Sequence, residues 1–441
     1  MGPPIEPTQT DEALPPRADV VVIGGGIIGV SAALFLARQG VSVLVCEKGR
    51  LACEQSSRNW GWCRQTGRDF REVPLIIESL RLWNEFAREG LETGFRACGI
   101  LYVAESDEDR DSHERWLESV RPFQIGSRII EGDALAEQMP GAVKRYRSGL
   151  YTPSDGRAEP QKAVPALAAA ARAAGAVIVE TCAVRGLDLQ AGRVVGVVTE
   201  RGRVVCDNVI LAGGAWSRLF CGSLGVTLPQ LKVRASVFRT APIEGGPETS
   251  AWLGRFAYRK RADGGYTIAN GRSNVVPVVP DTFRFFREFL PAARAEKRGI
   301  RLRLDRRFVQ EAMTPRRWTL DKPSPFERDR VLDPEPVRAM NDAAADEIKS
   351  VFRVFRGMSV VQQWAGMIDV TPDVIPVISE IDAVPGLVVA TGFSGHGFGI
   401  GPAAGRLAGE IATGRRTVVD ANAFRFSRFA DGSPIVIDAR R

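Results

Sequence analysis

Residues 18–49 read ADVVVIGGGIIGVSAALFLARQGVSVLVCEKG, and this stretch decides the fold. Its core, residues 20–37, is almost unbroken in apolar and small side chains, a pattern that a membrane-spanning helix shares. Asp19 at the front edge and the glycines at positions 24, 25, 26 and 29 argue against a membrane segment. The residues before these glycines, Val20 to Ile23, form a β-branched run typical of a buried parallel strand.

The order of elements in this stretch predicts a nucleotide-binding unit. A strand leads into a glycine turn, then into a helical pattern that stops at Gly40, and then into a second strand that ends in Glu47. Gly24, Gly26 and Gly29 have the spacing GxGxxG, which allows a tight turn, close approach of the backbone to a pyrophosphate, and close helix–strand packing. Free N–H groups at the helix start favour phosphate charge, and an acid in the position of Glu47 accepts ribose hydroxyls. We therefore expect a Rossmann-like α/β fold that binds an unphosphorylated dinucleotide.

The composition argues against several other classes of protein. The 59 Lys and Arg residues exceed the 52 Asp and Glu residues to give a net charge of +7, but the arginines are dispersed, so we expect no nucleic-acid partner. Seven cysteines without a CxxC pair predict no disulfide framework and no zinc site, and His113 and His396 are the only histidines, so no metal is expected. Residues 1–17 are Pro-rich and acidic, which predicts a flexible leader without an export signal. We expect a cytoplasmic protein without a membrane span.

The rest of the chain alternates between two kinds of pattern. One kind combines β-branched strands, glycine turns and helices of small residues, which are typical of parallel α/β sheets. It covers residues 18–85, 151–225 and 366–441. The other kind, in residues 86–150 and 226–365, combines short strands with charged or aromatic helices, including one expected over residues 281–297. We predict a Rossmann-like domain assembled from three segments, with an inserted α+β substrate-binding domain built on a mainly antiparallel sheet.

Four stretches, in their order along the chain, resemble the FAD-dependent amino-acid and amine oxidoreductases grouped with D-amino-acid oxidase, the DAO superfamily, which includes glycine oxidase, sarcosine oxidase and D-amino-acid dehydrogenases. The stretches are residues 20–49, residues 155–184 (DGRAEPQKAVPALAAAARAAGAVIVETCAV), residues 209–217 (VILAGGAWS), and residues 364–411, which begin WAGMIDVTPD and contain GFSGHGFGIG. The resemblance covers nearly the whole chain. It implies FAD as the cofactor and a small amino acid or amine as the substrate.

The resemblance assigns a set of residues to the cofactor. Glu47 is expected at the adenosine ribose, Ser56 near the flavin and its ribityl chain, and the backbone of Val184 at the adenine. The full set is Gly24, Gly26, Ile27, Ile28, Gly29, Glu47, Lys48, Ser56, Ser57, Arg58, Val184, Ala212, Gly213, Trp216, Gly392, Ser394, Gly395, His396, Gly397 and Phe398. The loop of residues 392–398 is expected near the isoalloxazine, where glycine-rich backbone can bring N–H donors close to the flavin carbonyl oxygens.

Two departures from the family pattern affect the cofactor linkage and the substrate. Covalent members attach the flavin through a cysteine near the stretch AGMIDVTPD, but no cysteine follows Cys221, so we expect non-covalent FAD. Several members that oxidise amino acids place a carboxylate-binding arginine just before TPD, whereas this chain has Met367, Ile368 and Asp369 there. The usual carboxylate clamp is therefore missing.

The stretch SSRNWGWCRQTGRD, residues 56–69, offers a replacement for this clamp. Arg64 and Arg68 lie in the region where sarcosine-oxidising relatives place a carboxylate-binding arginine, and a guanidinium matches a carboxylate with two parallel hydrogen bonds. Trp60 and Trp62 are candidates for the apolar wall of the pocket. The alternative is that the tryptophans pack in the core and the arginines lie on the surface.

Asp369 and His396 complete the candidate catalytic set of Arg64, Arg68, Trp60, Asp369 and His396. An acid where relatives carry an arginine favours a basic substrate such as arginine or lysine, although a structural acid ahead of Thr371 is the alternative. For His396, ordering of the loop is favoured over proton transfer.

The predicted reaction is FAD-dependent oxidation of an amino acid. A hydride passes from the α-carbon to flavin N5, and the resulting imine hydrolyses to a 2-oxo acid and ammonia. Three alternatives stay open: oxidation of a secondary amine, an N-methyl amino acid or a 2-hydroxy acid; a flavoprotein subunit of a heteromeric dehydrogenase; and an NAD-dependent dehydrogenase. The electron acceptor, oxygen or another carrier, the D or L configuration of the substrate, and a homo-oligomeric state are left open too.

Overall fold

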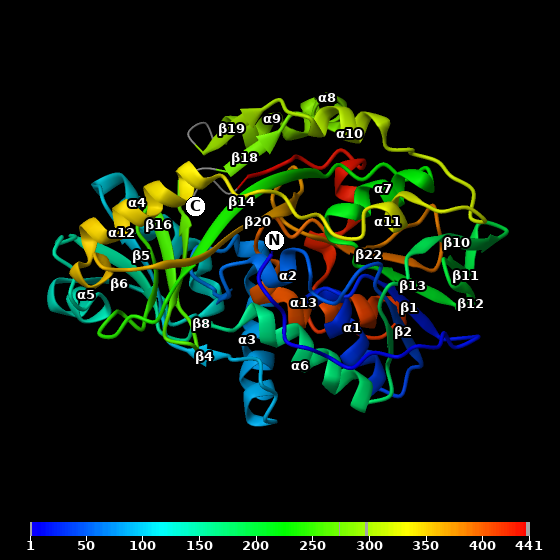
Figure 1. Ribbon diagram of the computed structural model, residues 1–441, viewed down its shortest axis with the longest axis horizontal. Helices are drawn as coiled ribbons and strands as arrows, with labels where there is room; N and C mark the ends of the chain where they lie inside the picture. Colours follow the sequence, from blue (N-terminus) through cyan, green and yellow to red (C-terminus); the bar gives the residue numbers. More distant parts are fainter. Residues whose placement is uncertain (1, 273, 296–298, 438–441) are drawn as a thin grey trace.

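The computed structural model describes residues 2–272, 274–295 and 299–437 (Figure 1). A mostly parallel α/β unit lies on the right of Figure 1, and a larger, mainly antiparallel sheet lies on the left. Between them, β14 (Leu231–Thr240) and β20 (Val360–Val370) pair antiparallel along their length. This architecture confirms the predicted fold class.

The sheet of the α/β unit has β1 (Val20–Ile23) at an inner position. β1 pairs in parallel with β13 on one side and with β2 on the other, and β22 and β9 extend the parallel pairing. At one edge, β21 is antiparallel to β22. The order is β21 (Val377–Glu380), β22 (Leu387–Thr391), β13 (Asn208–Leu211), β1, β2 (Val43–Cys46) and β9 (Val177–Val179). As expected, these strands come from three separated segments of the chain.

Helices cover this sheet through close contacts between backbones. Helix α1 (Ile27–Arg38) packs against α13 (Gly397–Ala412) and α6 (Pro160–Ala173), and α3 (Val73–Arg88) packs against α13. The contact between α1 and α13 depends on Gly405, because a Cβ there would lie 2.5 Å from the carbonyl oxygen of Ile28. The small side chains at this contact let the two helices approach closely. The start of α13 and the end of β1 line the same cavity.

The second sheet has ten strands among the described residues, and most neighbouring pairs are antiparallel. The order along its path is β19 (Ile300–Arg303), β18 (Asn274–Pro277), β14, β17 (Tyr266–Asn270), β16 (Phe256–Lys260), β15 (Ser250–Trp252), β5 (Ile100–Ala104), β7 (Ser148–Thr152) and β6 (Arg128–Glu131), with β20 paired to β14. Helix α12 (Arg338–Val351) packs against β14, β16 and β17. The sequence predicts a domain boundary after residue 365, and this position lies inside strand β20. The bounds of the two domains therefore stay a prediction.

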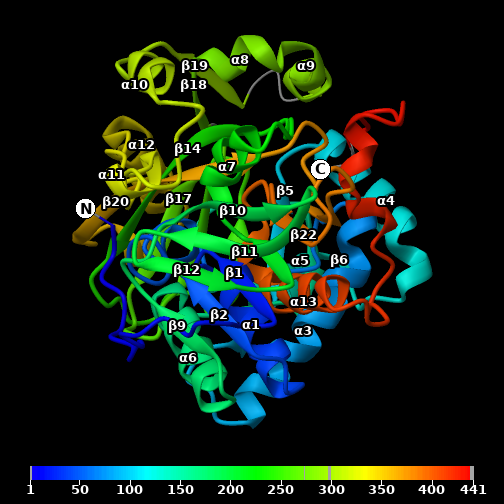
Figure 2. The same cartoon turned by 90° about the vertical axis from the view of Figure 1, so that its right-hand side faces the viewer.

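Smaller elements complete the chain. One three-stranded antiparallel sheet, β10 (Val184–Gln190), β11 (Arg193–Thr199) and β12 (Gly202–Val205), faces the viewer in Figure 2. Another consists of β3 (Trp62–Cys63), β8 (Gly156–Arg157) and β4 (Arg96–Ala97). The remaining α-helices are α2 (Gln55–Arg58), α4 (Asp107–Val120), α5 (Gly132–Gln138), α7 (Ser217–Ser223), α8 (Pro280–Arg284), α9 (Phe286–Ala295), α10 (Arg307–Met313) and α11 (Pro325–Arg328). Short 3-10 turns lie at Phe70–Glu72, Arg121–Phe123, Gly214–Trp216, Arg353–Phe355, Asn422–Phe424 and Phe426–Phe429.

The single helix expected over residues 281–297 is a wrong prediction. The described part of this range forms two helices, α8 and α9, and residues 296 and 297 lie outside the described chain. The break falls at Phe285, which is 1% exposed, whereas Phe283 and Phe286 are 67% and 61% exposed. The buried ring of Phe285 thus marks the one-residue break between the two helices.

Two residues of the segment expected to form a flexible leader, Glu6 and Asp11, contact α6. The backbone N–H of Glu6 donates to the carbonyl of Gln161 (3.1 Å), and the Asp11 carboxylate pairs with Arg172 at 2.7 Å. No helix in the described ranges is long and apolar enough to cross a membrane. Within the same ranges, no three His, Cys, Asp or Glu side chains are arranged to hold a metal ion.

Candidate active site

A cavity of about 400 Å³ opens where the carboxyl ends of β1, β2, β13 and β22 face β14 and β20. This crevice, outside the carboxyl ends of parallel strands, is where doubly wound α/β folds bind their ligands. The assigned residues that line it are Gly24, Gly26, Ile27, Ile28, Glu47, Lys48, Ser56, Arg58, Trp60, Arg64, Arg68, Val184, Ala212, Gly213, Trp216, Asp369, Ser394, Gly395, His396, Gly397 and Phe398. Gly29, Ser57 and Gly392 are outside this lining.

The glycine turn after β1 leaves its backbone open to the cavity. Gly24 has φ +112°, and a Cβ there would lie 2.5 Å from the carbonyl oxygen of Ala212. Gly29 has a packing role, because a Cβ there would lie 2.0 Å from the Gly24 carbonyl oxygen. The first helical N–H, on Ile27, donates to Ser56 Oγ at 2.9 Å. The N-terminus of α1 therefore presents the partial positive charge that a pyrophosphate requires.

Glu47 follows β2 and faces the same cavity. Its carboxylate accepts hydrogen bonds from the backbone N–H groups of Gly25 and Gly49, both at 2.7 Å. Burial raises the pKa of Glu47, and these two hydrogen bonds oppose that shift. The carboxylate is thus fixed next to the glycine turn, where a nucleotide ribose would lie.

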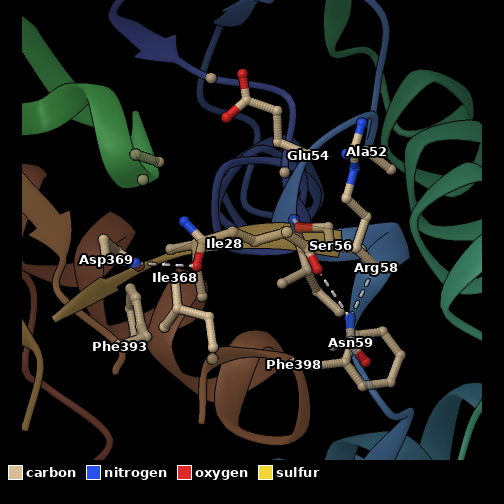
Figure 3. Close-up of a pocket in the computed structure, with 18 of the residues that line it drawn as sticks. Ile28, Ala52, Glu54, Ser56, Arg58, Asn59, Ile368, Asp369, Phe393 and Phe398 are labelled. Atoms are coloured by element: carbon tan, nitrogen blue, oxygen red, sulfur yellow. Dashed lines mark hydrogen bonds between the residues drawn. The ribbon is translucent and has the colours of Figure 1, made fainter. Parts of the chain in front are cut away.

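Ser56 and Arg58 lie on α2, at the centre of the view in Figure 3. The Arg58 guanidinium donates to the carbonyl oxygens of Ala365 (2.9 Å) and Cys53 (3.0 Å), and it pairs with Asp333 at 2.8 Å. These bonds tie α2 to β20. Arg58 therefore lines the cavity while its guanidinium is occupied by protein partners.

Asp369 shapes the glycine-rich loop of residues 392–398. Its Oδ2 accepts hydrogen bonds from Gly392 N (2.6 Å), Thr391 Oγ1 (2.9 Å) and Gln230 Nε2 (3.0 Å), and its carbonyl accepts one from Ser394 N (2.9 Å). Burial raises the pKa of this carboxyl group, and the hydrogen bonds from Gly392 and Thr391 oppose that shift. Ser394 has φ +51°, a strained conformation for a residue with a side chain. Asp369 and Phe393 lie together on one side of the cavity in Figure 3.

His396 and Arg68 meet at the start of α13. Arg68 Nη2 donates to the His396 carbonyl at 3.1 Å, and Arg68 Nη1 lies 3.6 Å from the buried carboxylate of Glu72. The Nδ1 atom of His396 lies 3.4 Å from that same carboxylate. Because Arg68 is 1% exposed and has these partners, its placement favours a structural role over substrate binding. The placement of His396 likewise favours ordering of the loop.

Arg64 has a different environment. Its half-buried guanidinium lies 5.5 Å from the centre of the Tyr102 ring, and Nη1 donates to the carbonyl of Thr66. Within the described chain it forms no direct ion pair, although its charge acts to lower the pKa of the buried Asp155 carboxyl group. The Trp60 and Trp62 rings pack edge to face at 5.2 Å in the same cavity wall. A cationic group therefore lies next to two tryptophan rings in the cavity wall.

The sequence did not identify Glu54, Phe326 and Arg330 as lining residues. The Oε1 atom of Glu54 accepts a hydrogen bond from Trp216 Nε1 at 2.9 Å, and the Lys48 ammonium lies 4.0 Å from the centre of the Trp216 ring. Glu54 lies between Glu47 and Ser56, both of which are assigned to the cofactor, so its place in the sequence was a usable signal. Phe326 and Arg330 come from a segment without regular periodicity, and the chain order gives no signal for them.

The lining fits FAD. One end has open backbone at Gly24 and Gly26 with a buried carboxylate at Glu47, and the other end has the loop of residues 392–398 at a helix N-terminus. A single cavity connects the two ends, as an extended dinucleotide requires.

The family profile described as FAD dependent oxidoreductase (DAO) matches residues 19–411. The chain belongs to this family. The resemblance predicted from the four stretches is confirmed, and the protein is an FAD-dependent amino-acid or amine oxidoreductase.

The chain is similar to solved structures and curated proteins, and the share of each protein that is covered differs. An L-amino acid deaminase from Proteus myxofaciens, solved in complex with anthranilate, has a TM-score of 0.93 and 32% identity, covering 96% of each chain. The N-methyl-L-tryptophan oxidase of Yersinia pestis is 24% identical over 93% of this chain and 99% of that protein. The mitochondrial sarcosine dehydrogenase of Homo sapiens is 30% identical over 53% of this chain, and the match spans 26% of that longer protein.

Proposed function

We propose that this oxidoreductase deaminates an L-amino acid with an apolar side chain, giving the 2-oxo acid and ammonia. The observation that carries the proposal is Arg64, a half-buried guanidinium that lies beside Trp60 and Trp62 in the cavity wall and forms no direct ion pair within the described chain. The similarity to an L-amino acid deaminase, at 32% identity over 96% of this chain, supports both the reaction and the L configuration.

The residues of this chain have three tasks in the proposed reaction. Arg64 binds the substrate carboxylate and so orients the α-carbon. Trp60 and Trp62, together with Val237 of β14, contact the side chain and exclude water. The loop held by Asp369 places the start of α13 in the cavity wall, where its backbone would contact the flavin. Bound FAD supplies the two-electron oxidation of the α-carbon.

An apolar substrate has more support than the basic one predicted from Asp369. The Oδ2 atom of Asp369 already accepts three hydrogen bonds, from Gln230, Thr391 and Gly392. A substrate cation at this carboxylate would compete with these donors. The preference for a basic amino acid stays a prediction. It would be supported if arginine or lysine reduced the flavin faster than leucine or phenylalanine.

We also propose that FAD is held without a covalent bond. No cysteine follows Cys221, and the lining cysteines, Cys46 and Cys53, lie near Glu47 and Glu54 rather than near the loop of residues 392–398. Acid precipitation should therefore release intact FAD into the supernatant. A yellow pellet would contradict this part of the proposal.

A secondary amine is the second candidate substrate, because the curated relatives include an N-methyl-L-tryptophan oxidase that spans 93% of this chain. Such a substrate also has a carboxylate for Arg64. Its product would be formaldehyde or another aldehyde in place of ammonia, so product analysis separates the two reactions.

The test is anaerobic reduction of the flavin by a panel of amino acids, comparing the native chain with Arg64→Met. We expect L-leucine or L-phenylalanine to bleach the native flavin, and Arg64→Met to raise the half-saturating concentration at least tenfold. A matched control is Arg128→Met, because Arg128 also stacks on a tyrosine, at 5.6 Å from the Tyr151 ring, but lies outside the cavity lining. If the native protein and Arg64→Met had the same half-saturating amino-acid concentration, Arg64 would not be the residue that binds the substrate carboxylate.

A further inference from the structure

A strap of residues 326–333 lies over the end of the cavity that holds Glu47. Its Phe326 and Arg330 line the cavity together with Glu47 and Val184. The Phe326 ring lies 5.9 Å from the Trp216 ring, at an interplanar angle of 72°. A Cβ on Gly49, two residues after Glu47, would lie 2.8 Å from the Arg330 carbonyl oxygen. The strap backbone therefore rests directly on the turn that carries the ribose-binding acid.

Side chains of the nucleotide-binding segment hold the strap by its backbone. The Lys48 ammonium donates to the carbonyl oxygens of Asp329 and Arg330, both at 2.7 Å. The Oε1 atom of Glu54 accepts from the Leu332 N–H at 3.1 Å. Lys48 and Glu54 themselves lie 3.3 Å apart and both line the cavity. The residues that face the cofactor site are thus the same ones that fix the strap.

Two ion pairs add side-chain latches. Arg330 forms a two-pronged pair with Glu200, with Nη1 at 2.8 Å from Oε1 and Nη2 at 2.6 Å from Oε2. Glu200 is oriented by the Ala183 N–H at 2.7 Å, immediately before Val184. Arg185, on the other side of Val184, pairs with Glu327 at 2.9 Å. Both latches therefore join the strap to the residues around Val184.

We propose that this strap is a clamp on the adenosine half of FAD and that its opening limits the rate at which FAD leaves the protein. An acid in the position of Glu47 binds the adenosine ribose, so the strap covers that part of a bound dinucleotide. The covered half becomes free only when the strap loses its contacts with Lys48, Glu54, Glu200 and Arg185 and when the pair of Asp333 with Arg58, at 2.8 Å, breaks. Such local opening is a separate equilibrium from global unfolding. The proposal rests on non-covalent FAD and is independent of the substrate proposed above.

The experiment measures the release of FAD from the holoprotein as the rise of free-flavin fluorescence after dilution. Glu200→Gln removes the charge of this ion pair, and Arg330→Met removes the pair together with the bond from Arg330 to the Lys48 carbonyl. We expect each to raise the release rate about tenfold or more, and the double variant to match Arg330→Met. The control is Glu89→Gln, which breaks the surface pair of Arg38 and Glu89, at 34% exposure on both sides, far from the strap. Its release rate should equal that of the native protein.

A second measurement separates clamping from general destabilisation. Thermal unfolding of the apoprotein should change little in Glu200→Gln, because the strap latch opens locally. Equal release rates for Glu200→Gln and Glu89→Gln would overturn the proposal, and so would faster release that only parallels a lower apoprotein melting temperature. If Arg330→Met does not fold, Arg185→Met tests the second latch with the same expected direction. FAD that stays with the denatured chain would instead contradict non-covalent binding.

Discussion

Asp155 offers a sharp test of how the turn that carries Arg64 is held. Its carboxylate is fully buried and accepts hydrogen bonds from Gln65 N (2.7 Å), Thr66 N (3.0 Å) and Thr66 Oγ1 (2.7 Å). The two backbone donors belong to the residues that directly follow Arg64. The substitution Asp155→Asn preserves the shape of the side chain but replaces one acceptor oxygen by an NH₂ group.

The size of the effect follows from these contacts. In either orientation of the amide, Gln65 N–H or Thr66 N–H loses its acceptor and stays buried, which costs about 1–3 kcal/mol. The backbone N–H that keeps its acceptor then bonds to a neutral amide oxygen in place of a carboxylate, which removes about another 1 kcal/mol. We therefore expect the free energy of unfolding to fall by about 2–4 kcal/mol. Displacement of Arg64 should also raise the half-saturating amino-acid concentration more than it lowers the maximal rate of flavin reduction.

Urea unfolding and anaerobic flavin reduction measure the two effects. The matched control is Asp188→Asn, which breaks a surface pair with Arg203, where the two side chains are 30% and 52% exposed. An exposed pair of this kind contributes about 0–1 kcal/mol. If Asp155→Asn unfolded at the same urea concentration as Asp188→Asn and kept native half-saturation, the anchoring role of Asp155 would be refuted.

Two further predictions concern the glycine turn and a buried histidine. Gly24→Ala adds a Cβ 2.5 Å from the Ala212 carbonyl, whereas Gly40→Ala, at φ +75°, meets nothing within 4 Å. Gly24→Ala should therefore lose FAD on gel filtration, and Gly40→Ala should retain it; retention by both would contradict the tight turn. Burial lowers the pKa of His113 from 6.5 to about 4, so between these values the unfolded chain binds a proton that the folded chain does not. The free energy of unfolding should therefore fall by up to about 3 kcal/mol as the pH drops through this window. Urea unfolding at pH 7 and at pH 4.5 should show a smaller fall in His113→Gln, and an equal fall would refute the assignment.

The sequence predicts best the features that depend on neighbouring residues. The strand Val20–Ile23, the GxGxxG turn and α1 follow from β-branched side chains and from a turn that needs φ +112° at Gly24. The charged helix α4 begins at Asp107, and Ser106 and Asp109 form its capping box. These signals lie within a few residues of one another, so a single sequence contains them in full.

The features that the sequence misses depend on long-range contacts. Arg330 reaches Lys48 across 282 residues, and nothing in the intervening pattern indicates that the two meet. The position of Asp369 in the sequence suggests that it binds a cationic substrate, but its carboxylate is taken by Gln230, 139 residues away, and by Thr391, 22 residues away. Likewise, the contacts of Arg68 with the α13 start and with the Glu72 carboxylate distinguish it from Arg64, although the two arginines are alike in sequence.

The most direct measurement is the absorbance spectrum of the purified protein under argon while L-phenylalanine is added, followed by quantification of the keto acid. We expect a flavin band that bleaches with one equivalent of phenylpyruvate and one of ammonia formed per flavin, and a shift of this titration to higher concentration in Arg64→Met. A flavin band that no L-amino acid bleaches, in a protein that contains its full complement of FAD, would contradict the proposed reaction.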